Sequence, residues 1–110
     1  MMADRLFRAF SDPTRLRILH LLSKGELCVC DIMAVIRAPQ PKVSRHLAYL
    51  KRVGLVRDRK RGPWRHYSLA ETESRLQLRL LKCVSEGADE IAALKRDARK
   101  LASAPSNRCR

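Results

Sequence analysis

Residues 30–52 read CDIMAVIRAPQPKVSRHLAYLKR, and this stretch decides which fold we expect. Residues 30–37 predict a short helix that Ala38-Pro39 ends, because proline disfavours helical backbone at the residue before it. A second helix is expected over residues 40–52, where apolar residues recur at helical spacing. These apolar positions are Val43, Leu47 and Leu50. Two helices joined by so short a turn, the second strongly basic, are typical of a helix-turn-helix.

The segments on either side extend this pattern. Asp12-Pro13 combines a good N-cap with a good first helical residue, so a largely buried helix is expected over residues 13–23, after a short helix nearer the N-terminus. Residues 55–59 and 64–69 are expected as strands joined by a turn at residues 60–63. The two strands form a β-hairpin with a basic tip, which is a wing.

The sequence predicts one long helix from about residue 72 to residue 102. Its apolar residues recur at alternating spacings of four and three, which favours a second helix packed along that seam. We therefore expect a homodimer, although the seam has the alternative of packing on the chain's own core. The expected dimer contacts are Leu80, Val84, Ile91, Leu94 and Leu101.

The expected fold class is mostly α with a small β-hairpin (α+β), a winged helix-turn-helix that is dimeric through its terminal helices. Its length of 110 residues suits one domain. Residues 1–103 are expected to form a DNA-binding and dimerisation domain, and residues 104–110 a flexible C-terminal tail.

The charge of the chain indicates its partner. It carries 24 basic and 11 acidic residues, a formal net charge of +13, which favours double-stranded operator DNA as the partner of the helix-turn-helix. No apolar run approaches the ~20 residues that span a bilayer, so no membrane partner is expected. Asp4, Arg5 and Arg8 argue against a signal peptide, which predicts a cytoplasmic protein. No nucleophile–base–acid set is recognisable, so the chain is not expected to be an enzyme.

The predicted DNA contacts come from two segments. A helix-turn-helix reads the major groove with residues near the start of its second helix, and a wing reaches phosphates or an adjacent minor groove. Arg45 and Gln40 have side chains for bidentate contacts with guanine and adenine respectively. The expected DNA-binding residues are Gln40, Lys42, Val43, Ser44, Arg45 and His46 in the helix, with Arg59, Arg61 and Arg65 in the wing.

Two of the four cysteines, Cys28 and Cys30, form a local pair at the start of the helix predicted over residues 30–37. The helix dipole and the unpaired amides there favour the thiolate form, which is the metal ligand. In a regular helix, residues two apart point to nearly opposite sides. A ligand held by both sulfurs therefore needs the first turn to unwind or stay extended, and we expect that distortion to displace the recognition helix.

Four segments carry a family resemblance: FSDPTRLRIL (10–19), ELCVCD (26–31), QPKVSRHL (40–47), and GLV (54–56) followed by GPWRHY (62–67). In this order they resemble the opening helix, the metalloid-binding box, the recognition helix and the wing of the arsenic-responsive members of the ArsR/SmtB family of repressors. The resemblance covers roughly residues 6–69. It implies a homodimer that leaves its operator when As(III) or Sb(III) binds as inducer, with no permanently bound cofactor.

The resemblance also implies that Cys28 and Cys30 are thiolate ligands of arsenic, which binds sulfur in a three-coordinate pyramid. Arsenic-responsive members often carry a third cysteine where this chain has Met33. The third ligand therefore stays open among Cys109, Cys83, Met33 and a small exogenous thiol, although a core thiol is the simpler interpretation of Cys83.

The sequence leaves other signals and functions open. Antimonite, a methylated arsenical or a soft divalent metal are alternative inducers. A thiol redox sensor on the same scaffold, with a disulfide between Cys28 and either Cys30 or Cys83, is an alternative function. A constitutive architectural DNA-binding protein with incidental cysteines is another.

Overall fold

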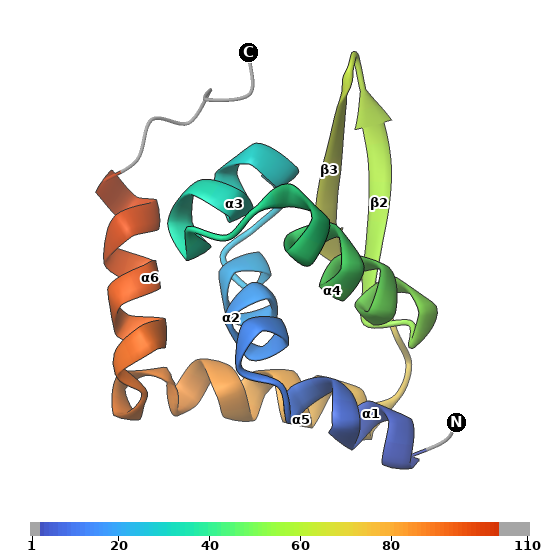
Figure 1. Cartoon of the computed structure of the whole chain (residues 1–110). Helices are drawn as coiled ribbons and strands as arrows, with labels where there is room; N and C mark the ends of the chain where they lie inside the picture. The colour runs from blue at the N-terminus through green and yellow to red at the C-terminus, as the bar shows by residue number, and fades with distance from the viewer. Residues whose placement is uncertain (1–2, 104–110) are drawn as a thin grey trace.

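Helix α2 (Pro13–Leu22) lies at the centre of the molecule, and the other helices pack around it (Figure 1). The structure, a computed structural model, describes residues 3–103. The remaining elements are α1 (Ala3–Phe10), β1 (Leu27–Cys28), α3 (Val29–Ile36), α4 (Gln40–Arg52), β2 (Val56–Arg61), β3 (Trp64–Leu69), α5 (Arg75–Glu86), the short 3-10 helix η1 (Ala88–Glu90) and α6 (Ala92–Ser103). Within this part of the chain, no helix has the length and apolar character needed to cross a membrane.

The start of α2 follows the expected capping chemistry. Asp12 has extended backbone, and its carboxylate accepts a hydrogen bond from the backbone N–H of Arg15 at 3.0 Å. Pro13 occupies the first turn, where a missing N–H leaves no partner unsatisfied. The helix ends at Leu22, and the residues that it buries in the core are Ile18, Leu19, Leu21 and Leu22.

The predicted helix-turn-helix is confirmed as α3 and α4. Arg37 closes α3 in a left-handed conformation (φ 61°), and its backbone N–H donates to the carbonyl of Met33 at 2.7 Å. Helix α4 begins at Gln40 and packs on α2 and α3. Its buried face consists of Val43, Leu47 and Leu50, as the helical spacing predicted.

The predicted wing is confirmed, and it has a third strand that was not expected. The sheet is antiparallel in the order β1-β3-β2, and Gly62 makes the hairpin turn at a φ of 62° that glycine adopts readily. Strand β1 pairs with β3 through Leu27 opposite Tyr67 and Cys28 opposite His66. A two-residue strand shows no alternation in sequence, which is why it was missed. Strand β1 therefore connects the wing directly to the start of α3.

The prediction of one long helix over residues 72–102 is wrong. Helix α5 ends at Glu86, η1 follows, and Ile91 has extended backbone (φ −118°, ψ 110°) before α6 begins. The two helices meet at a corner, and α6 turns back to pack on α2 and α3 (Figure 1). A salt bridge between Arg17 Nε in α2 and Asp97 Oδ2 in α6, at 2.8 Å, holds α6 in that place.

The corner also overturns most of the predicted dimer seam. Leu94 is fully buried, and Leu80 and Leu101 pack against the chain's own core. These three side chains are therefore already packed within one chain and have little surface for a second one. Val84 is partly buried, and only Ile91 of the predicted set is exposed.

Candidate DNA interface and cysteine pair

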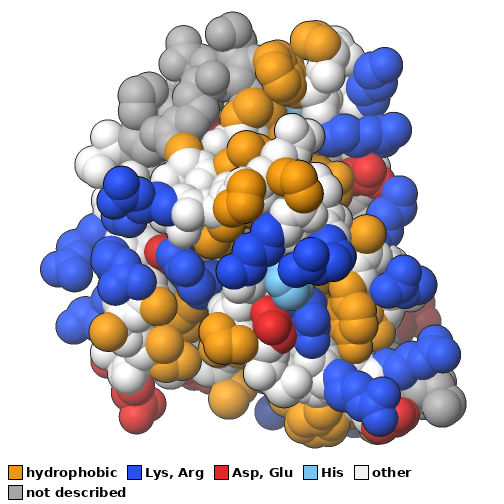
Figure 2. All heavy atoms as spheres, viewed as in Figure 1, with side chains coloured by type: hydrophobic (Ala, Val, Ile, Leu, Met, Phe, Trp, Pro, Cys, Tyr) orange, Lys and Arg blue, Asp and Glu red, His pale blue; other side chains and the backbone are white. Residues whose placement is uncertain are grey.

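Helix α4 presents most of the predicted base-reading side chains near its N-terminal end. Gln40, Lys42 and Arg45 are exposed, and Ser44 is partly exposed. Figure 2 shows Lys and Arg side chains spread over this face, with several gathered over α4 and along the wing. The exposed side of α4 therefore combines hydrogen-bonding groups with positive charge, which suits a major groove.

Two of the predicted α4 contacts do not share that exposure. Val43 is fully buried, so it has no surface to offer DNA, and its inclusion among the expected contacts is corrected. His46 is only partly exposed because it turns toward the start of α2, with Nδ1 3.8 Å from Oδ2 of Asp12. Burial lowers the pKa of His46, and neighbouring basic side chains lower it further against the opposing charge of Asp12.

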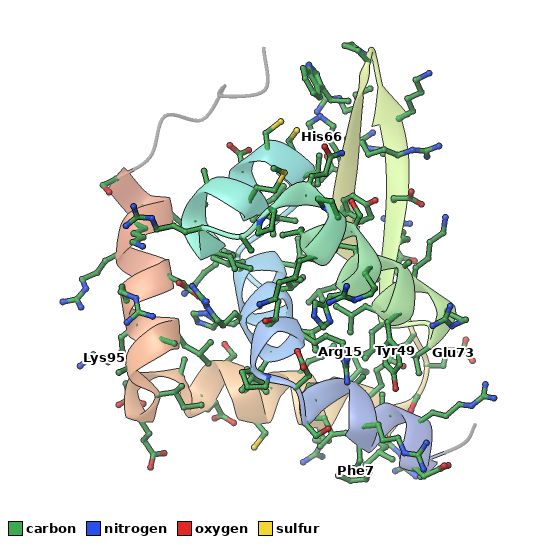
Figure 3. All side chains as sticks on the ribbon, in the orientation of Figure 1. Phe7, Arg15, Tyr49, His66, Glu73 and Lys95 are labelled. Carbon is green, nitrogen blue, oxygen red and sulfur yellow. The ribbon has the colours of Figure 1, made fainter. Side chains whose placement is uncertain are left out.

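Arg15 connects the recognition helix to α1. Its Nη2 donates to the carbonyl of Arg8 at 2.8 Å, and its Nε donates to the carbonyl of Ala9 at 3.2 Å, both in the last turn of α1. The guanidinium also lies over the ring of Tyr49 in α4, 4.1 Å from its centre (Figure 3). Such a cation–π contact is attractive, so one side chain holds α1, α2 and α4 together.

The predicted wing arginines each lie beside an acidic side chain. Arg59 donates two hydrogen bonds to Glu26, with Nε–Oε2 and Nη2–Oε1 distances of 2.7 Å, and Arg61 lies 3.9 Å from the same carboxylate. Arg65 lies 3.3 Å from Asp58. The hydrogen bonds from Arg59 hold the pKa of Glu26 below its ordinary value. All three arginine side chains are exposed, so their guanidinium groups stay accessible to DNA phosphates.

The cysteine pair spans the junction between β1 and α3. Cys28 is the last residue of β1, is buried, and lies opposite His66 of β3, which Figure 3 shows beside the start of α3. Cys30 lies in the first turn of α3 and is partly exposed. The backbone at Cys28 is extended (φ −69°, ψ 149°) rather than helical. This is the local conformation that two cysteines at this spacing need to face a common ligand.

A third ligand does not join the pair among the described residues. Within residues 3–103, no three His, Cys, Asp or Glu side chains form a group that can hold a metal ion. Cys83 is exposed on α5, so it is not a core thiol, and Figure 1 places α5 and α3 at opposite ends of α2. Met33 is partly buried and packs against the core. Cys109, the remaining candidate, lies outside the described residues.

Comparison with known proteins agrees with this geometry. The family described as bacterial regulatory protein, arsR family, matches residues 12–58. A homodimeric winged helix-turn-helix DNA-binding domain from Mycobacterium bovis, a possible ArsR-family transcriptional regulator, is 33% identical with a TM-score of 0.67, over 80% of this chain and 79% of that one. The chain belongs to the ArsR family. The helix-turn-helix of this ArsR-family protein lies entirely inside the matched segment.

Two relatives carry names that refer to a metalloid. The arsenical resistance operon repressor of Escherichia coli (strain K12) is 54% identical to this ArsR-family chain over 67 residues, which are 60% of this chain and 57% of the relative. The chain thus matches little more than half the length of that relative. The AntR antimony-specific transcriptional repressor is 32% identical with a TM-score of 0.64, over 80% of each chain.

Sequence reasoning about this ArsR-family chain missed the contacts of Arg15 and Glu26. Both side chains meet partners that are distant along the chain, so no local pattern marks the pairs. A usable signal for Arg15 is its position in a largely buried helix, because a buried guanidinium needs hydrogen-bond acceptors nearby. For Glu26 we find no such signal in the sequence.

Proposed function

We propose that this chain is a metalloid-responsive transcriptional repressor, which binds operator DNA as a homodimer and releases it when trivalent arsenic or antimony binds Cys28 and Cys30. The observation that carries the proposal is the position of this pair, between a strand of the wing sheet and the first helix of the helix-turn-helix. The names of the E. coli relative and of AntR support the choice of inducer.

The proposed DNA binding rests on charge and exposure. The net charge of +13 favours phosphate contacts that weaken as salt rises. In the major groove, Arg45 and Gln40 are suited to guanine and adenine, while Lys42 and Ser44 contact base edges or phosphate. The wing arginines approach the backbone or the minor groove, where phosphates compete with Glu26 for their guanidinium groups.

The proposed homodimer uses a different surface from the one that the sequence predicted. Phe7 is 52% exposed, Leu76 38% and Leu78 50%. They belong to α1 and α5, which both pack on α2 and run along the lower edge of the molecule in Figure 1. Large apolar side chains left exposed on neighbouring helices are typical of a protein interface. We therefore assign the dimer contact to α1 and α5 instead of the α6 seam.

Release follows two physical connections from the cysteine pair. Helix α3 packs on α4, so a change in the first turn of α3 displaces the recognition helix. Strand β1 pairs with β3, and Glu26, just before β1, holds Arg59 of β2. A rearrangement that brings both cysteine sulfurs to one ligand therefore alters the helix-turn-helix and the wing together.

The donor set fits a soft ion. Thiolates select soft ions, and Cys28 and Cys30 supply two of them from one short segment. Cys83 is removed from consideration by its place on α5. A thioether is a poorer ligand than a thiolate, so Cys109 or a small exogenous thiol is preferred to Met33 as the third donor.

The test is a fluorescence-anisotropy titration on a palindromic operator from upstream of the chain's own gene, with salt fixed and thiols reduced. Arsenite or antimonite is then added to the wild type, to the Cys28→Ser/Cys30→Ser variant and to the matched control Cys83→Ser. We expect release of the wild type and of the control but not of the double variant. A Cys109→Ser variant with weaker response identifies the third donor.

Two outcomes contradict the proposal. If all three proteins bind the operator and none responds to metalloid, the choice of inducer is wrong. If peroxide releases the wild type under strict metalloid exclusion while arsenite has no effect, the thiol redox sensor replaces it.

A further inference from the structure

The corner between α5 and α6 encloses a cavity that the proposed function does not use. The cavity has a volume of about 400 Å³, within the range typical of small-molecule sites. Its walls come from the end of α2, the end of α5, η1 and α6, so it exists only because the predicted long helix is broken. The floor includes the fully buried Leu94 and the small side chains of Ala88 and Ala98.

A buried imidazole lines this cavity without a polar partner for one nitrogen. His20 is only 2% exposed, and its Nδ1 has no hydrogen-bond partner among the described residues. Burial lowers the pKa of His20, and the charge of Lys24 lowers it further. The imidazole is therefore neutral at pH 7. Most buried polar atoms in proteins are hydrogen-bonded, so this one calls for a partner from outside the chain.

The rim of the cavity carries more positive than negative charge. Lys24, Lys95 and Arg99 line it, and none of these three forms an ion pair within residues 3–103. Glu86 and Asp89 also line it, which leaves a formal excess of one positive charge. Figure 3 shows Lys95 on the part of α6 nearest to the corner. A single negative charge balances this rim, whereas a multiply charged anion meets the two carboxylates.

We propose that the cavity binds a small monocarboxylate that also bears a hydroxyl group. The carboxylate pairs with the rim cations, and the carbon skeleton lies over Leu94 and the alanines. The hydroxyl reaches Nδ1 of His20, and because a hydroxyl both donates and accepts, it satisfies either tautomer of a neutral imidazole. This site lies apart from the cysteine pair and from the DNA-reading face of α4, so the proposal stands or falls without the metalloid function.

The test follows the imidazole resonances of His20 by NMR while the full chain is titrated with 4-hydroxybenzoate. Benzoate lacks the hydroxyl, phenol lacks the carboxylate, and inorganic phosphate is a compact anion with neither an apolar part nor a single charge. His46 and His66 lie elsewhere and serve as internal references. A His20→Gln variant assigns the resonance.

We expect a saturable shift of the His20 resonance with 4-hydroxybenzoate. Binding of benzoate should be weaker by about tenfold, the loss expected for one hydrogen bond in a buried site. The Lys95→Ala/Arg99→Ala variant should bind more weakly, whereas the matched control Arg96→Ala, an exposed α6 residue outside the cavity lining, should bind normally. Ala98→Phe fills the cavity and should abolish binding.

The proposal is overturned if 4-hydroxybenzoate gives no saturable shift at His20. It is also overturned if benzoate and 4-hydroxybenzoate bind equally, or if the rim variant binds as well as Arg96→Ala. Phosphate shifting all three histidines alike indicates an adventitious association of anions with a basic surface. Circular dichroism of each variant checks the fold, and the rim and control substitutions lie on exposed or partly exposed positions where folding is not at stake.

Discussion

Removal of Arg17 should destabilise the protein more than removal of its partner Asp97. Arg17 donates to both carboxylate oxygens of Asp97, from Nε at 2.8 Å and from Nη2 at 2.9 Å. The side chain of Asp97 is 0% exposed, whereas that of Arg17 is 20% exposed. Arg17→Met therefore leaves a carboxylate buried without its counter-ion, while Asp97→Asn leaves a guanidinium that still contacts water and an amide that still accepts a hydrogen bond.

The magnitudes follow from this difference in burial. Breaking a buried pair by removing one partner costs about 3–5 kcal/mol, and the fully buried Asp97 places Arg17→Met at the upper end. Asp97→Asn keeps a neutral hydrogen bond and should cost about 1–2 kcal/mol. The double variant Arg17→Met/Asp97→Leu removes both charges, and we expect it to recover most of the loss because apolar replacement of a buried pair is often neutral.

The assay is urea unfolding followed by far-UV circular dichroism at pH 7. All variants are compared at one protein concentration, because dimerisation makes the apparent stability depend on concentration. Lowering the pH should narrow the gap between Arg17→Met and the wild type, since protonation of Asp97 removes the unpaired charge. Equal losses for the two single variants, or a double variant as unstable as Arg17→Met, would refute this reasoning.

Three further predictions address the core, the pH response and the dimer. Val43→Ala should lower the free energy of unfolding by on the order of 2 kcal/mol in urea, whereas Ser44→Ala should leave it within about 0.5 kcal/mol and weaken operator affinity in anisotropy titrations. Burial lowers the pKa of His20 and of His46 from 6.5, so the unfolded chain binds these protons more tightly; stability should be full above pH 6.5 and fall below it, with a smaller fall in His20→Leu measured by urea titrations at each pH. Leu78→Ser should raise the dimer dissociation constant in sedimentation experiments without lowering monomer stability, and an unchanged constant places the interface elsewhere.

The helix-turn-helix and the wing could be predicted because their signals are local. Asp12-Pro13 marks the start of α2, Ala38-Pro39 separates the two helices, and Gly62 lies where the hairpin turns. Each of these features depends on the conformational preferences of a few neighbouring residues. The same locality explains why the position of the cysteine pair at the start of a helix was predicted correctly.

The corner after α5 could not be predicted because its cause is tertiary. An apolar seam with spacings of three and four looks the same whether it packs on a second chain or on its own core. What decides between them is Asp97, which reads in sequence as a polar residue of an exposed face but forms a buried pair with Arg17. The bend at Ile91, the cavity beside His20 and the exposed face of α5 all follow from that choice.

The contacts of Arg15 have a consequence for how the operator must be laid out. Arg15 fastens the last turn of α1 to Tyr49 of α4, so in a dimer joined through α1 each recognition helix is tied to the twofold axis by direct contacts. The separation of the two reading heads is then a rigid gauge rather than an adjustable span. One extra base pair between half-sites rotates one of them by about 35° around the DNA axis, since a turn takes 10–10.5 base pairs. A protein built this way measures phase along DNA as strictly as it reads bases.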